Sequence, residues 1–355
     1  MEKLMLAMSG GVDSSAALVL LKEKYDVIGA TLMLNDSKDE NGDSMCGSSQ
    51  DIVDAARVAE KMNVPHHVFD MRDVFSATVK KSFVDSYLNG ETPNPCVNCN
   101  EVIKFGALLK KAKELSCKYL ATGHYARVEY DEASDRYLLK KALLKDGTVN
   151  PKDQSYVLYR LSQEQLSAAV FPLSGMEKSE IRELALENGL VSASKPDSQD
   201  ICFVPEGCYG DFIEENIGYK YPAGKFCDTD GNVIGEHKGV IHYTIGQRRG
   251  IGVGFGRPVY VISKNAENNT VVLGDNEQLF RDTIIARDLN MIAVTEKEFS
   301  CKAKTRYKQT EQPCKVVISE DKATVIFDEP IRAVTPGQHI VFYDGDTVLG
   351  GGVIC

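Results

Sequence analysis

Residues 9–15, with the sequence SGGVDSS, constrain the fold more than any other part of the chain. An apolar run at residues 4–8 precedes them, and residues 14–24 carry apolar side chains at helical spacing, which predicts a strand, a glycine turn and a helix. Two adjacent glycines allow backbone N–H groups to turn inward together, and the start of a helix adds unpaired N–H groups and a positive dipole end. The segment therefore predicts a phosphate-binding loop. It is not a Walker loop, because that motif requires a lysine before the hydroxyl residue.

The first 205 residues alternate between strand-like and helix-like patterns, which predicts a doubly wound parallel sheet in an α/β domain. The expected strands are residues 4–8, 27–33, 66–69 and 119–122, and the expected helices are residues 14–24, 51–62, 74–88, 102–115, 155–161, 163–169 and 178–188. Ligands of such sheets bind beyond the carboxyl ends of the strands, where residues 9–15 and 122–124 both lie.

After Pro205 glycine and proline become frequent, and short strands with turn signals replace helices. We expect domains at residues 1–205, 206–275 and 276–355, with hairpin turns at Asp230-Gly231, Asn268-Asn269 and Asp344-Gly345. The last domain is all β and predicts a small β-barrel. Its expected strands are residues 286–289, 301–307, 315–318, 323–327, 339–343 and 348–354.

Composition places the chain among cytoplasmic globular proteins. It has 355 residues, 43% hydrophobic and 26% charged, and no apolar run is long enough to span a membrane. The chain starts directly with a core strand, so no signal peptide is expected. The net charge of −10 argues against a protein that coats nucleic acid nonspecifically, although it allows a local basic track. The ten cysteines are not expected to form a disulfide framework in a reducing cytosol.

Two cysteine-containing segments depart from the pattern of buried small side chains. Residues 92–100 contain two prolines and predict a rigid loop with Cys96 and Cys99 just before a helix, where the pKa of a thiol falls. These cysteines could be incidental, half of a zinc site, reactive sulfurs or iron–sulfur ligands, and each functional alternative needs a further partner. Cys202, in a second proline-started segment at residues 195–203, is a candidate partner.

These motifs together resemble one enzyme family. SGGVDSS resembles the PP-loop of ATP pyrophosphatases, which cleave ATP between the α- and β-phosphates. With TPNPxxxCN, ATGHYAR, KDQSY, KPDSQDICF, GQRRG, KTRYKQ and AVTPGQ in this order, nearly the whole chain resembles tRNA-specific 2-thiouridylases. Those enzymes place sulfur at C2 of the wobble uridine, position 34. The resemblance implies a PP-loop catalytic domain related to adenine nucleotide alpha hydrolases, a small central domain and a C-terminal β-barrel that binds tRNA.

The resemblance also implies a two-stage reaction and its residues. ATP adenylates uridine O2, and sulfur then displaces AMP at C2. Cys99 corresponds to the family's nucleophile and Cys202 to the carrier of a persulfide, and the two pass through a transient disulfide. Asp13 would help to hold Mg²⁺. The implied ATP contacts are Ala7, Met8, Ser9, Gly10, Gly11, Val12, Asp13 and Ser14 at the phosphates, Met33 near adenine, and Gly123 against the nucleotide.

The resemblance further implies that tRNA is the macromolecular substrate, with lysine, glutamate and glutamine tRNAs as acceptors. A cysteine desulfurase or a sulfur-relay protein would supply sulfur, and no membrane partner is expected. The target base must leave its stack to be modified. Asn94, Pro95 and Cys96 match the positions that contact this base. The further implied tRNA contacts are His124, Lys152, Asp153, Gln154, Arg306, Tyr307 and Gln338.

One departure leaves the sulfur chemistry open. Many family members have Asp where this chain has Cys96, and Cys96, Cys99 and Cys202 could instead hold a [4Fe–4S] cluster. Three other functional classes fit the residues less well. A PP-loop amidating synthetase would not require Cys99 or Cys202, and a noncatalytic RNA-binding module would leave the phosphate loop unexplained. A thiol redox protein normally has its CxxC motif at the start of a helix after a strand, whereas here prolines before Cys96 and Cys99 predict a loop.

Overall fold

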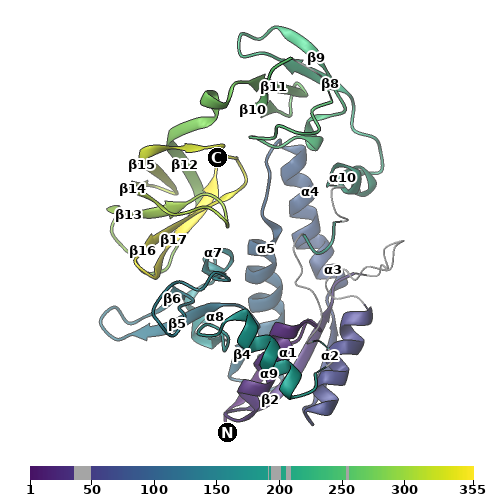
Figure 1. Ribbon diagram of the computed structural model, residues 1–355, viewed down its shortest axis with the longest axis vertical. Helices are drawn as coiled ribbons and strands as arrows, with labels where there is room; N and C mark the ends of the chain where they lie inside the picture. Colours follow the sequence, from purple (N-terminus) through teal and green to yellow (C-terminus); the bar gives the residue numbers. More distant parts are fainter. Residues whose placement is uncertain (36–48, 191, 193–200, 205–208, 253–255) are drawn as a thin grey trace.

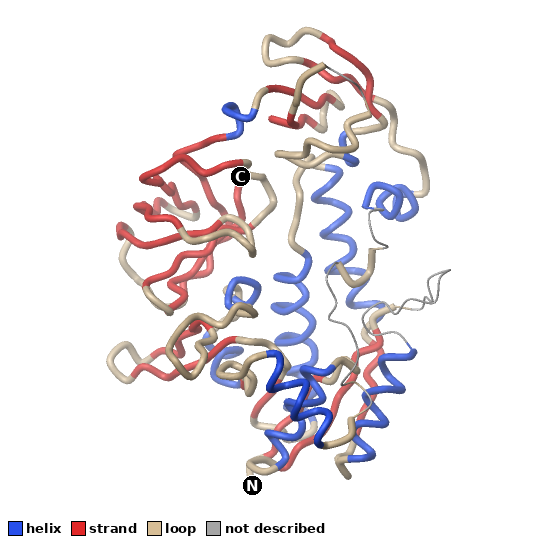
Figure 2. The backbone as a smooth tube through the Cα atoms, in the orientation of Figure 1, coloured by secondary structure: helices blue, strands red, loops and turns tan. Residues whose placement is uncertain are grey.

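The computed structural model describes residues 1–35, 49–190, 192, 201–204, 209–252 and 256–355. A parallel sheet, a small second sheet and a β-barrel surround two long helical segments (Figure 1). Helices cluster around the parallel sheet and in the centre, whereas the barrel and the second sheet consist mainly of strands (Figure 2). In the described part of the chain, no helix combines the length and apolar composition needed to cross a bilayer.

The N-terminal part contains a five-stranded parallel sheet, which confirms the predicted fold class. Its strand order is β3-β2-β1-β4-β7. The strands are β1 (Lys3–Ala7), β2 (Asp26–Met33), β3 (His66–Asp70), β4 (Tyr119–Ala121) and β7 (Ala169–Val170). Leu4 and Leu6 join one core cluster and Met5 joins another, and all three are fully buried. Both faces of the sheet are therefore covered, as parallel sheets require.

Helices cover the two faces of this sheet unequally. One face carries α1 (Val12–Lys22), α2 (Ser49–Lys61) and α9 (Lys178–Glu187). The other face carries two long segments, formed by α3 (Arg72–Phe75), η1 (Ser76–Lys80) and α4 (Lys81–Leu88), and by α5 (Pro95–Asn98), η2 (Cys99–Leu108) and α6 (Leu109–Glu114). The short helices α7 (Ser155–Leu158) and α8 (Gln163–Ala168) follow. Both η1 and η2 are π-helical, which the sequence analysis did not anticipate.

The second sheet has the order β10-β11-β8-β9. Its elements are α10 (Tyr209–Ile217), β8 (Gly224–Cys227), β9 (Val233–His237), η3 (Val240–His242), β10 (Tyr260–Asn265) and β11 (Thr270–Gly274). The predicted turns at Asp230-Gly231 and Asn268-Asn269 join β8 to β9 and β10 to β11. Helix α10 was not expected, because the frequent glycines and prolines after Pro205 predicted short strands in place of helices.

The C-terminal strands form a closed six-stranded barrel, as predicted. The elements are η4 (Asn276–Leu279), β12 (Phe280–Met291), β13 (Glu298–Lys304), β14 (Gln312–Ser319), β15 (Lys322–Arg332), β16 (His339–Asp344) and β17 (Thr347–Ile354). Strand β12 pairs with both β15 and β17, and this second pairing closes the barrel. The strand expected at residues 301–307 ends at Lys304, so Arg306 and Tyr307 lie in the turn that follows.

A hairpin of the N-terminal part, which the sequence analysis missed, extends the barrel sheet. Strands β5 (Ala126–Asp131) and β6 (Arg136–Lys141) pair with each other, and β6 meets β17 through Lys140 and Thr347. The buried Lys141 ammonium lies 2.6 Å from a carboxylate oxygen of Glu311 in the barrel. The hairpin thus joins the barrel to the parallel-sheet part.

Helix α7 makes a second connection, through His339 of β16. The Tyr156 hydroxyl donates to the His339 carbonyl oxygen (2.8 Å), and the Tyr159 hydroxyl lies 2.8 Å from His339 Nδ1. The imidazole is buried, and this burial lowers the pKa of His339 to about 3. His339 is therefore neutral in the folded protein near neutral pH.

This buried histidine predicts acid sensitivity of the interface. In the unfolded chain this histidine takes up a proton below about pH 6.5, whereas folded His339 stays neutral down to about pH 3. The contribution of His339 to the free energy of unfolding is therefore complete above about pH 6.5 and decreases as the pH falls. Between pH 7 and pH 5 the free energy of unfolding should fall by about 2 kcal/mol through this group. Urea unfolding at both pH values should show a smaller pH effect in His339→Gln than in the wild type. An equal pH effect in both proteins would contradict the assignment.

Candidate active site

The predicted phosphate loop lies between the end of β1 and the start of α1. Gly10 has φ +72°, and a Cβ there would lie 2.6 Å from the Asp51 carbonyl oxygen, so the turn and its packing on α2 both require glycine. The Ser9 N–H donates to Ser14 Oγ (3.2 Å), and the Ser15 hydroxyl donates to the Gly11 carbonyl oxygen (2.8 Å). The serines therefore hold the loop against the first turn of the helix.

Asp13, in the first turn of α1, has two donors from distant parts of the chain. The Tyr125 hydroxyl and the Lys178 ammonium each lie 2.7 Å from Asp13 Oδ1. The sequence analysis identified Asp13 but not these two partners, because neither lies near it in sequence. The carboxylate is thus held in a fixed place beside the loop.

The segment after β4 packs directly on the phosphate loop. Strand β4 runs parallel to β1, so Gly123 follows at the same edge of the sheet. A Cβ on Gly123 would lie 3.0 Å from the Ser14 backbone nitrogen and 3.1 Å from the Asp13 carbonyl carbon. A side chain at this position would therefore require the loop to shift by a few tenths of an ångström. The predicted contact of Gly123 with a nucleotide remains a prediction, as does that of Met33 at the end of β2.

His124 is buried beside this contact. Its Nδ1 lies 2.7 Å from the Thr122 hydroxyl oxygen, and its Nε2 lies 3.5 Å from the Lys104 ammonium. Burial lowers the pKa of His124 well below its usual value, so the ring is neutral near neutral pH. The predicted contact of His124 with tRNA is untested, and in this structure both ring nitrogens face protein groups.

The prediction that residues 92–100 form a loop is wrong in its second half. The Asn94 side chain accepts a hydrogen bond from the Cys96 N–H (3.2 Å) and caps a helix in which Pro95 is the first residue. Proline is compatible with this position because the first N–H groups of a helix have no partner within the helix. Cys96 and Cys99 therefore lie in the first turns of a helix, and Cys96 is exposed whereas Cys99 is half-buried.

The π-helical geometry of η2 gives Cys99 an unexpected neighbour along the helix. In a π-helix, hydrogen bonds join residues five apart, so Cys99 and Lys104 lie near the same face. Lys104 in turn contacts His124, next to Gly123. The cysteine helix and the phosphate loop are thus connected through consecutive contacts. The sequence did not point to Lys104, because Cys99 was expected in a loop before the helix and not in the same helix as Lys104.

Cys202 belongs to the short described segment 201–204 and is half-buried. Its neighbour Phe203 is buried, and the Phe203 ring centroid lies 5.5 Å from that of Phe75, 5.3 Å from that of Phe83 and 5.4 Å from that of Phe212. This aromatic cluster fixes the segment against α3 and α4, which neighbour the cysteine helix (Figure 1). Cys99 and Cys202 both pack against the same core cluster.

The barrel holds the chain that leads to the cysteine helix. The Thr92 N–H donates to the Pro336 carbonyl oxygen (2.8 Å), and Gln338 Nε2 donates to the Thr92 carbonyl oxygen (2.8 Å). A Cβ on Gly337 would lie 2.7 Å from Glu91 Cβ, so the two segments are in close contact. Gln338, predicted to contact tRNA, here fixes the backbone just before Asn94.

The remaining predicted tRNA contacts are largely engaged within the protein. Asp153 is buried and accepts from the Ser155 hydroxyl (2.8 Å), and this burial raises the pKa of Asp153. The Gln154 amide oxygen accepts from the Tyr125 N–H (3.0 Å), whereas Lys152 is exposed. Their roles toward tRNA remain predictions.

Arg306 and Tyr307 lie where the barrel meets the second sheet and α7. Arg306 Nη2 donates to the carbonyl oxygen of Ala333 (2.8 Å), and burial lowers the pKa of Arg306. The Tyr307 ring lies 6.2 Å from that of Tyr156, and burial raises the pKa of Tyr307 to about 12. A contact of either residue with tRNA is likewise a prediction.

The three candidate cluster ligands are not gathered in the described structure. Within the described residues, no three Cys, His, Asp or Glu side chains lie closely enough together to hold a metal ion, so Cys96, Cys99 and Cys202 do not form a ready ligand set for a cluster.

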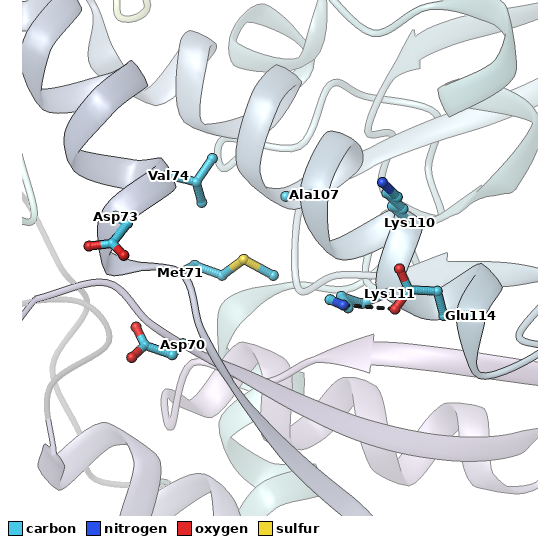
Figure 3. A pocket seen from close by; sticks show the side chains of 8 residues that line it. All are labelled: Asp70, Met71, Asp73, Val74, Ala107, Lys110, Lys111 and Glu114. Atoms are coloured by element: carbon cyan, nitrogen blue, oxygen red, sulfur yellow. Dashed lines mark hydrogen bonds and ion pairs between the residues drawn. The ribbon is translucent and has the colours of Figure 1, made fainter.

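A hollow beside α3 and α6 lies outside the candidate site and contains none of the predicted site residues (Figure 3). It is lined by Asp70, Met71, Asp73, Val74, Ala107, Lys110, Lys111 and Glu114.

Comparison with known proteins identifies the family of this chain. Three family models match, described as the tRNA methyl transferase HUP domain (residues 2–206), the tRNA methyl transferase PRC-barrel domain (210–275) and the aminomethyltransferase β-barrel domain (281–354). A protein of Clostridioides difficile named tRNA-specific 2-thiouridylase MnmA is 46% identical, over 99% of this chain and 98% of its own length. The chain belongs to the tRNA-specific 2-thiouridylase family.

Two further relatives support the same membership. The tRNA-specific 2-thiouridylase MnmA of Acetivibrio thermocellus is 47% identical over 99% of both chains. The tRNA-specific 2-thiouridylase MnmA 1 of a Thermoanaerobacter species is 50% identical over 99% of this chain and 97% of its own. The family models carry a methyl transferase name, whereas these relatives are named 2-thiouridylases. The resemblance inferred from the sequence motifs is thus confirmed.

The aromatic cluster around Phe203 predicts a specific change in the reactivity of Cys202. Phe203→Ala removes the ring that anchors this segment, and truncation of a buried phenylalanine costs about 3–5 kcal/mol. Local opening should then expose the thiol and raise the alkylation rate of Cys202 at least several-fold. Mass spectrometry of iodoacetamide-treated protein measures this rate, with the exposed Cys355 as internal control. An unchanged rate at Cys202 would contradict the anchoring role.

Proposed function

We propose that this protein is a transferase that catalyses ATP-dependent 2-thiolation of uridine 34 in tRNA. The observation that carries the proposal is the series of contacts from the phosphate loop through Gly123 and His124 to Lys104 on the cysteine helix. It joins a nucleotide-binding element to a thiol-bearing element, which this reaction requires. We further propose that residues 1–205 form the catalytic domain, 206–275 a central domain and 276–355 a tRNA-binding barrel.

The first stage activates the uridine carbonyl. ATP would bind with its phosphates at the loop and its adenine near Met33. Uridine O2 attacks the α-phosphorus, the bond to the bridging oxygen breaks, and pyrophosphate leaves with the electron pair while the N3 proton passes to water. The fixed Asp13 carboxylate is a suitable ligand for Mg²⁺, which would offset the charge of the pyrophosphate. The oxygen at C2 thereby becomes part of AMP, a good leaving group.

The second stage supplies sulfur from two cysteines. The Cys99 thiolate attacks the inner sulfur of a Cys202 persulfide, which forms a Cys99–Cys202 disulfide and releases hydrosulfide. Hydrosulfide attacks C2, the bond from C2 to oxygen breaks, and AMP leaves with the electron pair. A thiol reductant then restores both cysteines by two-electron reduction.

The partners follow from this chemistry. A cysteine desulfurase or a sulfur-relay protein would load Cys202, and tRNAs for lysine, glutamate and glutamine would be the acceptors. Asn94, Pro95 and the exposed Cys96 lie at the start of the cysteine helix, where a flipped base could meet Cys99. The reaction is proposed to take place in the cytoplasm.

Loss of either sulfur-handling thiol should stop the reaction after ATP and tRNA have bound. Cys99→Ser and Cys202→Ser should each lower 2-thiouridine formation to background, because a hydroxyl cannot replace the thiolate or carry a persulfide. Mass spectrometry of nucleosides from treated tRNA measures the product. Cys355→Ser is the matched control and should remain active, since this cysteine is exposed at the C-terminus. Full activity of either site variant would overturn the assignment of the two cysteines.

A second candidate chemistry uses a [4Fe–4S] cluster held by Cys96, Cys99 and Cys202, and the feature that favours it is Cys96 at a position where many family members have Asp. Because the three thiols are not gathered in the described structure, we derive no step through a cluster. Iron and sulfide analysis after anaerobic purification tests this alternative. We expect iron-free protein to thiolate tRNA with a persulfide donor, and activity that depends strictly on iron would favour the cluster.

A further inference from the structure

A side chain from outside the cysteine helix binds two of its backbone carbonyls. Gln165, in the first turn of α8, is half-buried, and its Nε2 donates to the carbonyl oxygens of Glu101 (2.9 Å) and Phe105 (3.1 Å) in η2. Carbonyls inside a helix already accept from N–H groups of that helix, so the amide uses their second lone pairs. The two bonds tie α8 to the π-helical stretch that begins at Cys99.

The π-helical register of η2 needs support from outside the helix. Such helices are rare in proteins and occur frequently at functional sites. Gly106 weakens this one further, because glycine is a poor helix former. A Cβ on Gly106 would lie 3.1 Å from the Glu101 carbonyl oxygen, five residues earlier, so the backbone closes tightly on the carbonyl that Gln165 also binds. Gln165 therefore acts where the register is determined.

The Gln165 amide is itself fixed in orientation. Its Oε1 accepts from the Ser162 N–H (2.9 Å), and the Gln165 N–H donates to Ser162 Oγ (3.2 Å), which together form the capping box of α8. The next residue, Leu166, is fully buried in the same core cluster as Ile103 and Phe105. With its oxygen engaged at the cap, the amide presents its NH₂ group to η2.

Two neighbouring contacts fix the first residues of η2 on the same side. Asn100 Nδ2 donates to the Val157 carbonyl oxygen (3.0 Å), and Arg160 Nε lies 2.5 Å from Glu101 Oε2. Gln165 adds a link from the carbonyl of Glu101 to that of Phe105, about one turn later. It thereby fixes how far the helix winds between these two carbonyls.

We infer that Gln165 is a positioning residue for the thiolation reaction, because it holds the helical register that places Cys99 beside Lys104. This inference rests on the proposed function. In an α-helix five residues turn through about 500°, so Lys104 would lie about 140° around the axis from Cys99. Because Lys104 contacts His124, next to Gly123, loss of the π-helical register would move Cys99 relative to the part of the site where uridine is activated.

A comparison of the two reaction stages separates this role from a purely structural one. Gln165→Glu still accepts from the Ser162 N–H but cannot donate to η2. The single-turnover rate of 2-thiouridine formation should fall by about 10- to 100-fold, because small misplacements of reacting groups have effects of this size. Pyrophosphate release in the same turnover should keep its wild-type rate, because adenylation does not use Cys99. Quenched-flow samples, assayed for both products, measure the two rates.

Gln163→Glu is the matched control. It removes a bond of the same kind on the same helix, from Gln163 Nε2 to the Tyr137 carbonyl oxygen (3.0 Å), and should leave both rates unchanged. Gln165→Met has a similar length and no donor, so it serves if Gln165→Glu does not fold. Equal slowing of both stages, wild-type thiolation by the Gln165 variant, or the same selective loss in Gln163→Glu would overturn the inference. A wild type that forms no 2-thiouridine would instead contradict the proposed function.

Discussion

The parallel pairing of β1 with β4 is the constraint on which the candidate site depends. It brings the chain after Ala7 and the chain after Ala121 to the same edge of the sheet. There Gly123 packs so closely against Ser14 and Asp13 that a Cβ would lie only 3.0–3.1 Å from their atoms. Any shift of this register would separate the phosphate loop from His124, and with it from Lys104 and the cysteine helix. The same register therefore brings the phosphate loop and the segment that leads to the cysteine helix to one edge of the sheet.

A second constraint acts on the start of the cysteine helix. The chain between α4 and α5 passes between the barrel and the second sheet, and a Cβ on Gly90 would lie 3.5 Å from Ala266 Cβ while Thr92 bonds to Pro336. The parallel-sheet part, the second sheet and the barrel thus meet within a few residues of Asn94. A tRNA bound across the barrel would press on the same segment that places Cys96 and Cys99. If the barrel binds tRNA as proposed, this arrangement links that binding to the position of the cysteine helix.

Sequence patterns predicted the local elements better than the contacts between them. The strand, glycine turn and helix around residues 9–15, the parallel sheet and the barrel each follow from short-range periodicity and turn residues, and all three structures are confirmed, whereas phosphate binding at the turn stays a prediction. Pro95 misled the prediction, because proline is excluded from helix interiors but suits the first position. The hairpin of β5 and β6 was missed, although its two strands pair with each other over six positions and β6 meets β17, over 200 residues away, at a single pair. Lys104 and Lys178 reach the site through π-helical register and tertiary packing, which no one-dimensional pattern records.

The central claim is that ATP activates uridine O2 so that sulfur can displace it. The most direct test uses tRNA that carries oxygen-18 at O2 of uridine 34, incubated with ATP, the protein and a persulfide donor. The account predicts that every thiolated tRNA yields one AMP with oxygen-18 in its phosphate, as measured by mass spectrometry. Unlabelled AMP alongside normal thiolation would contradict the account, because the oxygen would then leave by a route that does not involve the α-phosphate.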